Sequence, residues 1–201
     1  MGFLTEYFTN EIEAANRRIK INASFDTVLE IQNLFQEESL TEVDKIKQAL
    51  KMLVVNEYQL IGLSLSQQAD LLTKIFKECI NIKNRGSSKK DTVPIFDFEK
   101  DGEYIYSSFM SDYGIDLLSE RGKLHWKKFI ALFSGLSEHT KIMEVIKIRT
   151  MKVPRYNGHN QDEIQAILDL KSCYALDVKG HGGQEGLDTL FMTLERMAVT
   201  D

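Results

Sequence analysis

The first part of the chain alternates between hydrophobic and polar residues, and the rest follows a helical period. Ile19 and Ile21 fall on one face of a short segment, while Arg18 and Lys20 fall on the other. Because the side chains of a strand alternate between its two faces, this period predicts a β-hairpin over residues 11–22 with its turn at residues 15–17. One continuous helix is the alternative, although the ending Ile-Lys-Ile-Asn makes a poor helical face.

Seven later segments place apolar residues at spacings of three and four, the period of amphipathic helices. Their predicted ranges are 26–38, 42–54, 67–80, 98–113, 124–134, 138–153 and 161–173. Polar side chains that accept hydrogen bonds from a first helical turn mark the starts of helices. The caps that we predict are Ser24 or Asp26, Thr41, Asp97, Ser137 and Asn160, with one helix beginning after Ser66 and another ending at Gly114.

Two segments break the helical pattern. Residues 83–94 are polar and basic, and we predict a loop there because they bury too little apolar surface to offset the entropy of ordering. Four glycines between Gly180 and Gly186 predict a hinge. The last segment is predicted to be an amphipathic helix, either a detachable arm or an element that docks on its own domain, with apolar residues at Leu187, Leu190, Phe191, Leu194 and Met197.

The predicted fold class is therefore mainly α. A chain of 201 residues is long enough to bury a core and favours a single domain. We predict a helical domain with a short N-terminal β-hairpin over residues 1–176. The Gly-rich hinge and the C-terminal helix then occupy residues 177–201.

Aromatic residues gather between residues 97 and 154, the part of the chain that also holds the only Trp. Trp126 and Phe129 lie in a segment that is too apolar for a helix with a wide solvent-exposed face, so we expect this segment to lie at the centre of the core. Tyr106 falls off the stripe formed by Ile105 and Phe109, and we expect it to be an exposed anchor. Tyr and Trp are over-represented at the energetic centres of protein interfaces.

Composition excludes several classes of protein. The net charge is −5, from 25 Lys and Arg against 30 Asp and Glu, so no positive excess is available to neutralise phosphates along a nucleic acid. No apolar run approaches the roughly 18 residues of a membrane span, and the acids near the start argue against a signal peptide. We predict a soluble cytosolic protein with two reduced core thiols, Cys79 and Cys173.

The sequence contains no arrangement of residues that indicates a reaction. Its four His residues are scattered, no metal-ligand spacing is present and no phosphate-binding glycine motif occurs. Asp112 and Asp116 flank a glycine turn but lack the other oxygens of a calcium loop. We predict neither an enzyme nor a cofactor or metal site, and a small enzyme acting through His125 or Asp116 is the least favoured reading.

Several long strings resemble one known family. EKDGEYIYSSFMSDYGIDL, GKLHWKKFIALFSGL and IKIRTMKVP are similar to the core of the bacteriophage gene-product-fifteen family of long-tailed phages and prophages of Gram-positive bacteria. IKINASFDTVLEIQNLF and QALKML resemble its N-terminal hairpin and first helices. The resemblance covers residues 19–176 and supports the helical fold.

The resemblance also implies a role and a location. Family members usually lie between the genes for the major tail protein and the tape-measure protein, where tail assembly chaperones are encoded. The resemblance therefore implies a chaperone that binds the tape-measure protein in the host cytoplasm. The alternative is a structural or tail-completion protein that is retained in the virion. The major tail protein and self-association are further candidate interactions. The candidate partner-binding residues are Tyr106, Tyr113, Trp126, Phe129, Arg149, Leu190, Phe191 and Leu194.

Overall fold

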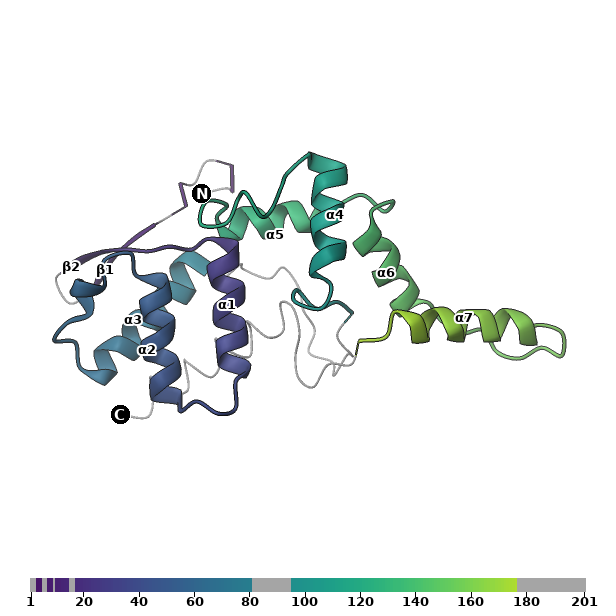
Figure 1. The fold of residues 1–201 in the computed structure, drawn as a ribbon, viewed down its shortest axis with the longest axis horizontal. Coiled ribbons are helices and arrows are strands. Elements are labelled where there is room, and N and C mark those ends of the chain that lie inside the picture. The colour runs from purple at the N-terminus through teal and green to yellow at the C-terminus, as the bar shows by residue number, and fades with distance from the viewer. Residues whose placement is uncertain (1–2, 5–6, 9, 15–16, 81–94, 177–201) are drawn as a thin grey trace. The chain divides into compact units, whose positions relative to one another are not determined.

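The computed structural model describes residues 3–4, 7–8, 10–14, 17–80 and 95–176 (Figure 1). The loop predicted over residues 83–94 and the hinge and helix predicted over residues 177–201 lie outside the described residues. Leu190, Phe191 and Leu194 lie there too. The division of the chain at residue 176 stays a prediction.

The described residues form a mainly α structure with one short hairpin, which confirms the predicted fold class (Figure 1). The elements are β1 (Glu11–Ala14), β2 (Arg17–Lys20), α1 (Phe25–Gln36), α2 (Glu42–Leu53), the 3₁₀-helix η1 (Glu57–Leu60), α3 (Leu65–Ile75), the π-helix η2 (Phe76–Ile80), α4 (Gly102–Tyr113), α5 (Trp126–Ser134), α6 (Lys141–Thr150) and α7 (Gln161–Cys173).

The hairpin follows the alternation of the sequence. Its strands pair antiparallel, with Ile12 opposite Ile19, and both of these side chains are buried. Charged residues point the other way, so that Arg18 lies within 3.7 Å of Glu13. The period of two therefore predicted both the element and its buried face.

The chain divides into two compact units. The described part of the first unit comprises residues up to Ile80 together with residues 120–132, and its core is formed by α1, α2, α3 and the start of α5. The second comprises residues 95–119 and 133–176. In its core Ile105 and Phe109 of α4 are buried, as are Ile142 and Val145 of α6.

Several helices begin where the sequence predicted, and others do not. Thr41 caps α2 by accepting a hydrogen bond from the Asp44 amide (3.2 Å), and Gly114 ends α4 in the left-handed region with φ of 63°. The third helix begins at Leu65 and not after Ser66, because Ser64 forms a reciprocal capping box with Gln67.

Two predicted caps stabilise turns that precede their helices. Asp97 accepts hydrogen bonds from the amides of Glu99 and Lys100 (both 2.9 Å), so α4 itself begins only at Gly102. Ser137 binds Asp112, and α6 begins at Lys141. Asp97 thus satisfies a local turn, whereas Ser137 is bound to Asp112 of α4, and in both cases the helix starts about one turn later.

The last described helix, α7, contains no buried residue. It is attached to the end of α6 by Lys171, whose ammonium group donates hydrogen bonds to the carbonyls of Ile148, Arg149 and Met151. Cys173 is exposed, so its prediction as a core thiol is wrong, whereas Cys79 is buried as predicted. The helical pattern around Cys173 is real, but no described element covers that side of it.

Candidate protein-binding surface

The start of α5 is fixed against the start of α1 within the first unit. The Phe25 amide donates to the Leu124 carbonyl (2.9 Å), and the Trp126 amide donates to the Ala23 carbonyl (2.8 Å). Ser24 and His125 pair between these two bonds as an isolated antiparallel bridge. The segment that carries the only Trp is therefore held by backbone hydrogen bonds on both sides of His125.

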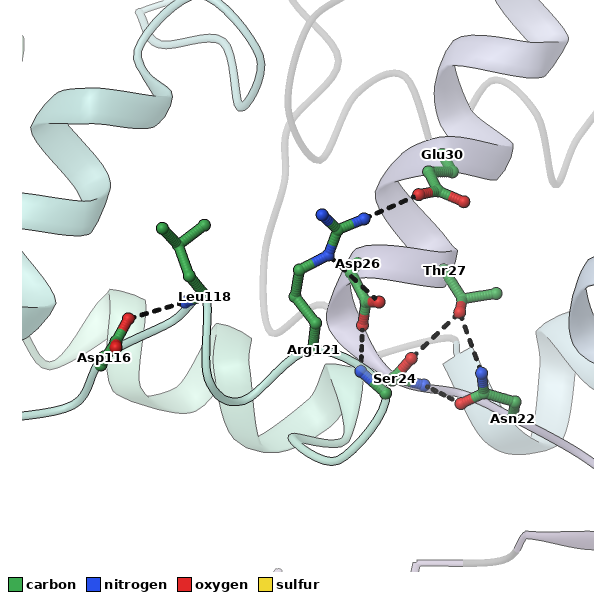
Figure 2. A network of polar contacts seen from close by, with 9 residues as sticks. Asn22, Ser24, Asp26, Thr27, Glu30, Asp116, Leu118 and Arg121 are labelled. Atoms are coloured by element: carbon green, nitrogen blue, oxygen red, sulfur yellow. Dashed lines mark hydrogen bonds and ion pairs between the residues drawn. The ribbon is translucent and has the colours of Figure 1, made fainter.

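A polar network strengthens this attachment. The Asp26 carboxylate accepts a hydrogen bond from the Gly122 amide (2.9 Å). Figure 2 shows Arg121 extending toward Asp26 and Glu30. The Thr27 hydroxyl bonds to Ser24 (3.0 Å), also in Figure 2. The first turn of α1 thus binds the loop that leads into α5, which determines where the first residues of α5 lie.

This geometry places two of the predicted contact residues in the core. Trp126 and Phe129 are fully buried, and the Phe129 ring stacks on Phe25 with 4.9 Å between centroids. The prediction that this segment is core is confirmed. The prediction of Trp126 as a partner-binding residue is wrong, because its side chain is fully buried.

The two predicted tyrosines on α4 are half-buried. Tyr113 makes an edge contact with Phe109 (5.8 Å), and burial together with the nearby Asp112 raises the pKa of its hydroxyl. Tyr106 keeps part of its side chain accessible. Both residues therefore stay candidates for contact with a partner.

Arg149 has a structural position. Its guanidinium forms two hydrogen bonds with the Asp101 carboxylate (2.6 and 2.8 Å) and donates to the carbonyls of Tyr174 (2.7 Å) and Ile95 (3.1 Å). Its side chain is only 10% exposed. The guanidinium is engaged inside the second unit and offers little surface to a partner, so the role of Arg149 in partner binding stays a prediction.

An exposed apolar surface lies where the sequence analysis made no prediction, between α2 and α3. We call it the connector patch, and its four side chains are 45–72% exposed: Val55, Tyr58, Ile61 and Leu65. Arg17 holds this connection in place by donating to the carbonyls of Gln59 (2.6 Å) and Ile61 (3.0 Å). The signal that could have found it is the recurrence of apolar residues every three positions, at Val55, Tyr58 and Ile61, between two predicted helices.

The residues considered for chemistry have other roles. Asp116 accepts a hydrogen bond from the Leu118 amide (3.0 Å) and closes a turn, as Figure 2 shows. The Nδ1 atom of His125 accepts one from the Lys127 amide (3.1 Å). Burial, together with Lys127 and Lys128, lowers the pKa of His125 to about 4, so the imidazole is neutral at pH 7. Burial raises the pKa of the Cys79 thiol to about 11.

Across the part of the chain that the structure describes, no three His, Cys, Asp or Glu side chains gather in a way that could hold a metal ion. Over the same residues, no helix has both the length and the apolar composition to cross a membrane. The described residues do present an exposed apolar surface, the connector patch.

Comparison with protein families identifies the class as bacteriophage proteins. The chain belongs to the family described as Bacteriophage Gp15 protein, whose model matches residues 4–176. The protein is thus related to the structural and tail proteins of phages. Neither the curated proteins nor the solved structures gave a match.

Proposed function

We propose that this protein is a tail assembly chaperone that binds the tape-measure protein in the host cytoplasm while the tail tube forms. The observation that carries the proposal is membership of the phage family over residues 4–176. The structure supports it with a helical surface that presents apolar side chains. A chaperone for a long helical protein needs such a surface and needs no reaction.

The connector patch is the surface that we assign to this contact. Its backbone is held by the hydrogen bonds from Arg17 to the Gln59 and Ile61 carbonyls, and the Val55 amide donates to the Lys20 carbonyl (3.0 Å). A rigid surface loses little conformational freedom on binding, so more of its contact energy appears as affinity. Tyr58 supplies a large ring with a polar end, a residue type common among interface hot spots.

We also propose that the protein acts without catalysis. The groups that a reaction would need are engaged elsewhere: Asp116 closes a turn, and Arg149 is paired with Asp101. His125 is neutral and buried next to Lys127 and Lys128. Each of these side chains therefore has a structural explanation.

Co-expression with the tape-measure protein of the same phage tests the proposal. We expect the two proteins to co-purify and the tape-measure protein to stay soluble only when its partner is present. Tyr58→Ala should weaken binding by about 2 kcal/mol, roughly 30-fold in Kd. The matched control is Tyr156→Ala, which removes an equally exposed ring (65% against 66%) outside the connector patch. Equal solubility of the tape-measure protein alone, with no co-purification, would contradict the chaperone function.

The alternative is a structural or tail-completion protein that stays in the virion. Mass spectrometry of purified particles distinguishes the two functions, because a chaperone leaves before the tail is complete. Stoichiometric recovery of this chain in finished virions would favour the structural role.

A further inference from the structure

An aromatic ring from the start of the chain covers His125. Phe8 stacks on the imidazole with 4.8 Å between ring centroids and 19° between planes. Phe3 contacts Phe8 edge-on at 5.2 Å, and the Lys128 ammonium lies 6.0 Å from the centre of the Phe8 ring. Phe8 therefore occupies a ring-binding seat formed by His125 and Lys128 at the start of α5.

The seat keeps a polar atom without a partner. His125 is 8% exposed, its Nδ1 atom accepts from Lys127, and its Nε2 atom is buried without a hydrogen bond. A buried imidazole N–H that is unsatisfied costs free energy. A histidine that served only to fill the core would carry this cost without any benefit. The geometry therefore points to a second state in which the Nε2 atom of His125 has a hydrogen-bond partner.

The segment that carries Phe8 exposes large apolar side chains to water. Leu4 and Tyr7 are each 96% exposed, although both are large apolar residues. They lie beside Phe3 and Phe8, whose rings contact each other. Among the described residues of this segment, Phe8 contacts the His125 ring, whereas Leu4, Tyr7 and half of Phe3 are exposed to water.

We propose that Phe3, Leu4, Tyr7 and Phe8 form a releasable latch, and that the seat on His125 and Lys128 is a binding site for an aromatic side chain of a protein partner. The ligand class follows from the structure, since the seat already holds a phenyl ring stacked on one side and next to a cation. Stacking and cation–π contacts are weak compared with the stability of a folded unit, so Phe8 can leave while the unit stays folded.

Release of the latch is linked to protonation of His125. The charged groups nearest the imidazole are Lys127 and Lys128 on α5, and the facing residue of the other segment is Ser24. Burial lowers the pKa of His125 to about 4 from an ordinary value of 6.5, and loss of Phe8 lets water reach the ring. The latched state therefore has the lower pKa. It is fully favoured above pH 6.5 and loses stability as the pH falls from there toward 4.

The first test is an NMR titration of the His125 imidazole in the isolated full chain. We expect Phe8→Ala to raise the pKa of His125 by about one unit or more, because desolvation is the largest cause of the shift. Tyr156→Ala is the control, because it removes an exposed ring outside both the latch and the seat, and it should leave the pKa of His125 unchanged. An equal His125 pKa in wild type and Phe8→Ala, with both folded by near-ultraviolet circular dichroism, would overturn the latch.

The second test examines the site itself. A peptide with the sequence MGFLTEYFTN is added in excess to the Phe8→Ala protein and to the wild type. We expect it to shift the His125 and Lys128 resonances in the variant and much less in the wild type, where the seat is filled. The same peptide carrying Phe8→Ala should shift neither. Lack of any shift at millimolar peptide overturns the binding site, and neither test involves the tape-measure protein.

Discussion

Two arginines of this protein both bind carboxylates, yet in different surroundings. Arg149 in the second unit is 10% exposed, and its partner Asp101 is 2% exposed, with two bonds of 2.6 and 2.8 Å. Arg121 in the first unit is 57% exposed and reaches Glu30 at 3.2 Å and Asp26 at 3.8 Å. The charges are the same, but water surrounds only one of the pairs.

The difference teaches where ion pairs matter for stability. Exposed pairs gain little because water and salt screen them. A buried pair costs desolvation when it forms, and removing one member leaves the other charge buried and uncompensated. Arg149 and Asp101 should therefore act as a unit, whereas Arg121 should act as an ordinary surface charge.

The largest effect is expected from Asp101→Ala. The substitution leaves the Arg149 guanidinium buried without its carboxylate, so the free energy of unfolding should fall by about 3–5 kcal/mol. Urea denaturation followed by circular dichroism measures it. A loss below about 1 kcal/mol would show that the pair is no more important than a surface pair.

An intermediate effect is expected from removing both charges. The double variant Asp101→Leu with Arg149→Met should be more stable than Asp101→Ala by about 2 kcal/mol, because no buried charge remains. It should still fall short of the wild type, since the carbonyls of Ile95 and Tyr174 lose their donor. If the double variant is the less stable of the two, the desolvation argument is incorrect.

The smallest effect is expected from Arg121→Ala. Asp26 keeps its bond to the Gly122 amide, so the loop before α5 stays attached. The free energy of unfolding should fall by about 0–1 kcal/mol. Repeating the denaturation at high salt should reduce the difference further, because salt screens exposed charges. If the loss in the free energy of unfolding is larger and does not depend on salt, Arg121 contributes to stability in the same way as the buried Arg149.

Much of the fold was predictable because its signals are local. The hairpin followed from the alternation around Ile19, and the end of α4 followed from Gly114. Helix starts were harder to predict, because Asp97 satisfies a turn and Ser137 binds Asp112 before the helices begin. A capping residue in the sequence shows that a backbone amide will be satisfied, but not which one.

The candidate surface was harder to predict. Periodicity placed Trp126 and Arg149 on helices, but it could not show that the first is fully buried and that Asp101, 48 positions away, binds the second. The connector patch was missed for a related reason. Its residues lie outside any long amphipathic pattern, and their exposure depends on the way Arg17 holds the connection.

The attachment of α7 has a consequence for proteolysis. Since α7 buries no side chain and is linked to α6 by the Lys171 ammonium group, we expect it to open at a lower free energy than the other described helices of the second unit. Lys171 is also a residue after which trypsin cuts. Its side chain has to leave the carbonyls before a protease can bind it, so the rate of cleavage at this bond reports directly how often the helix detaches.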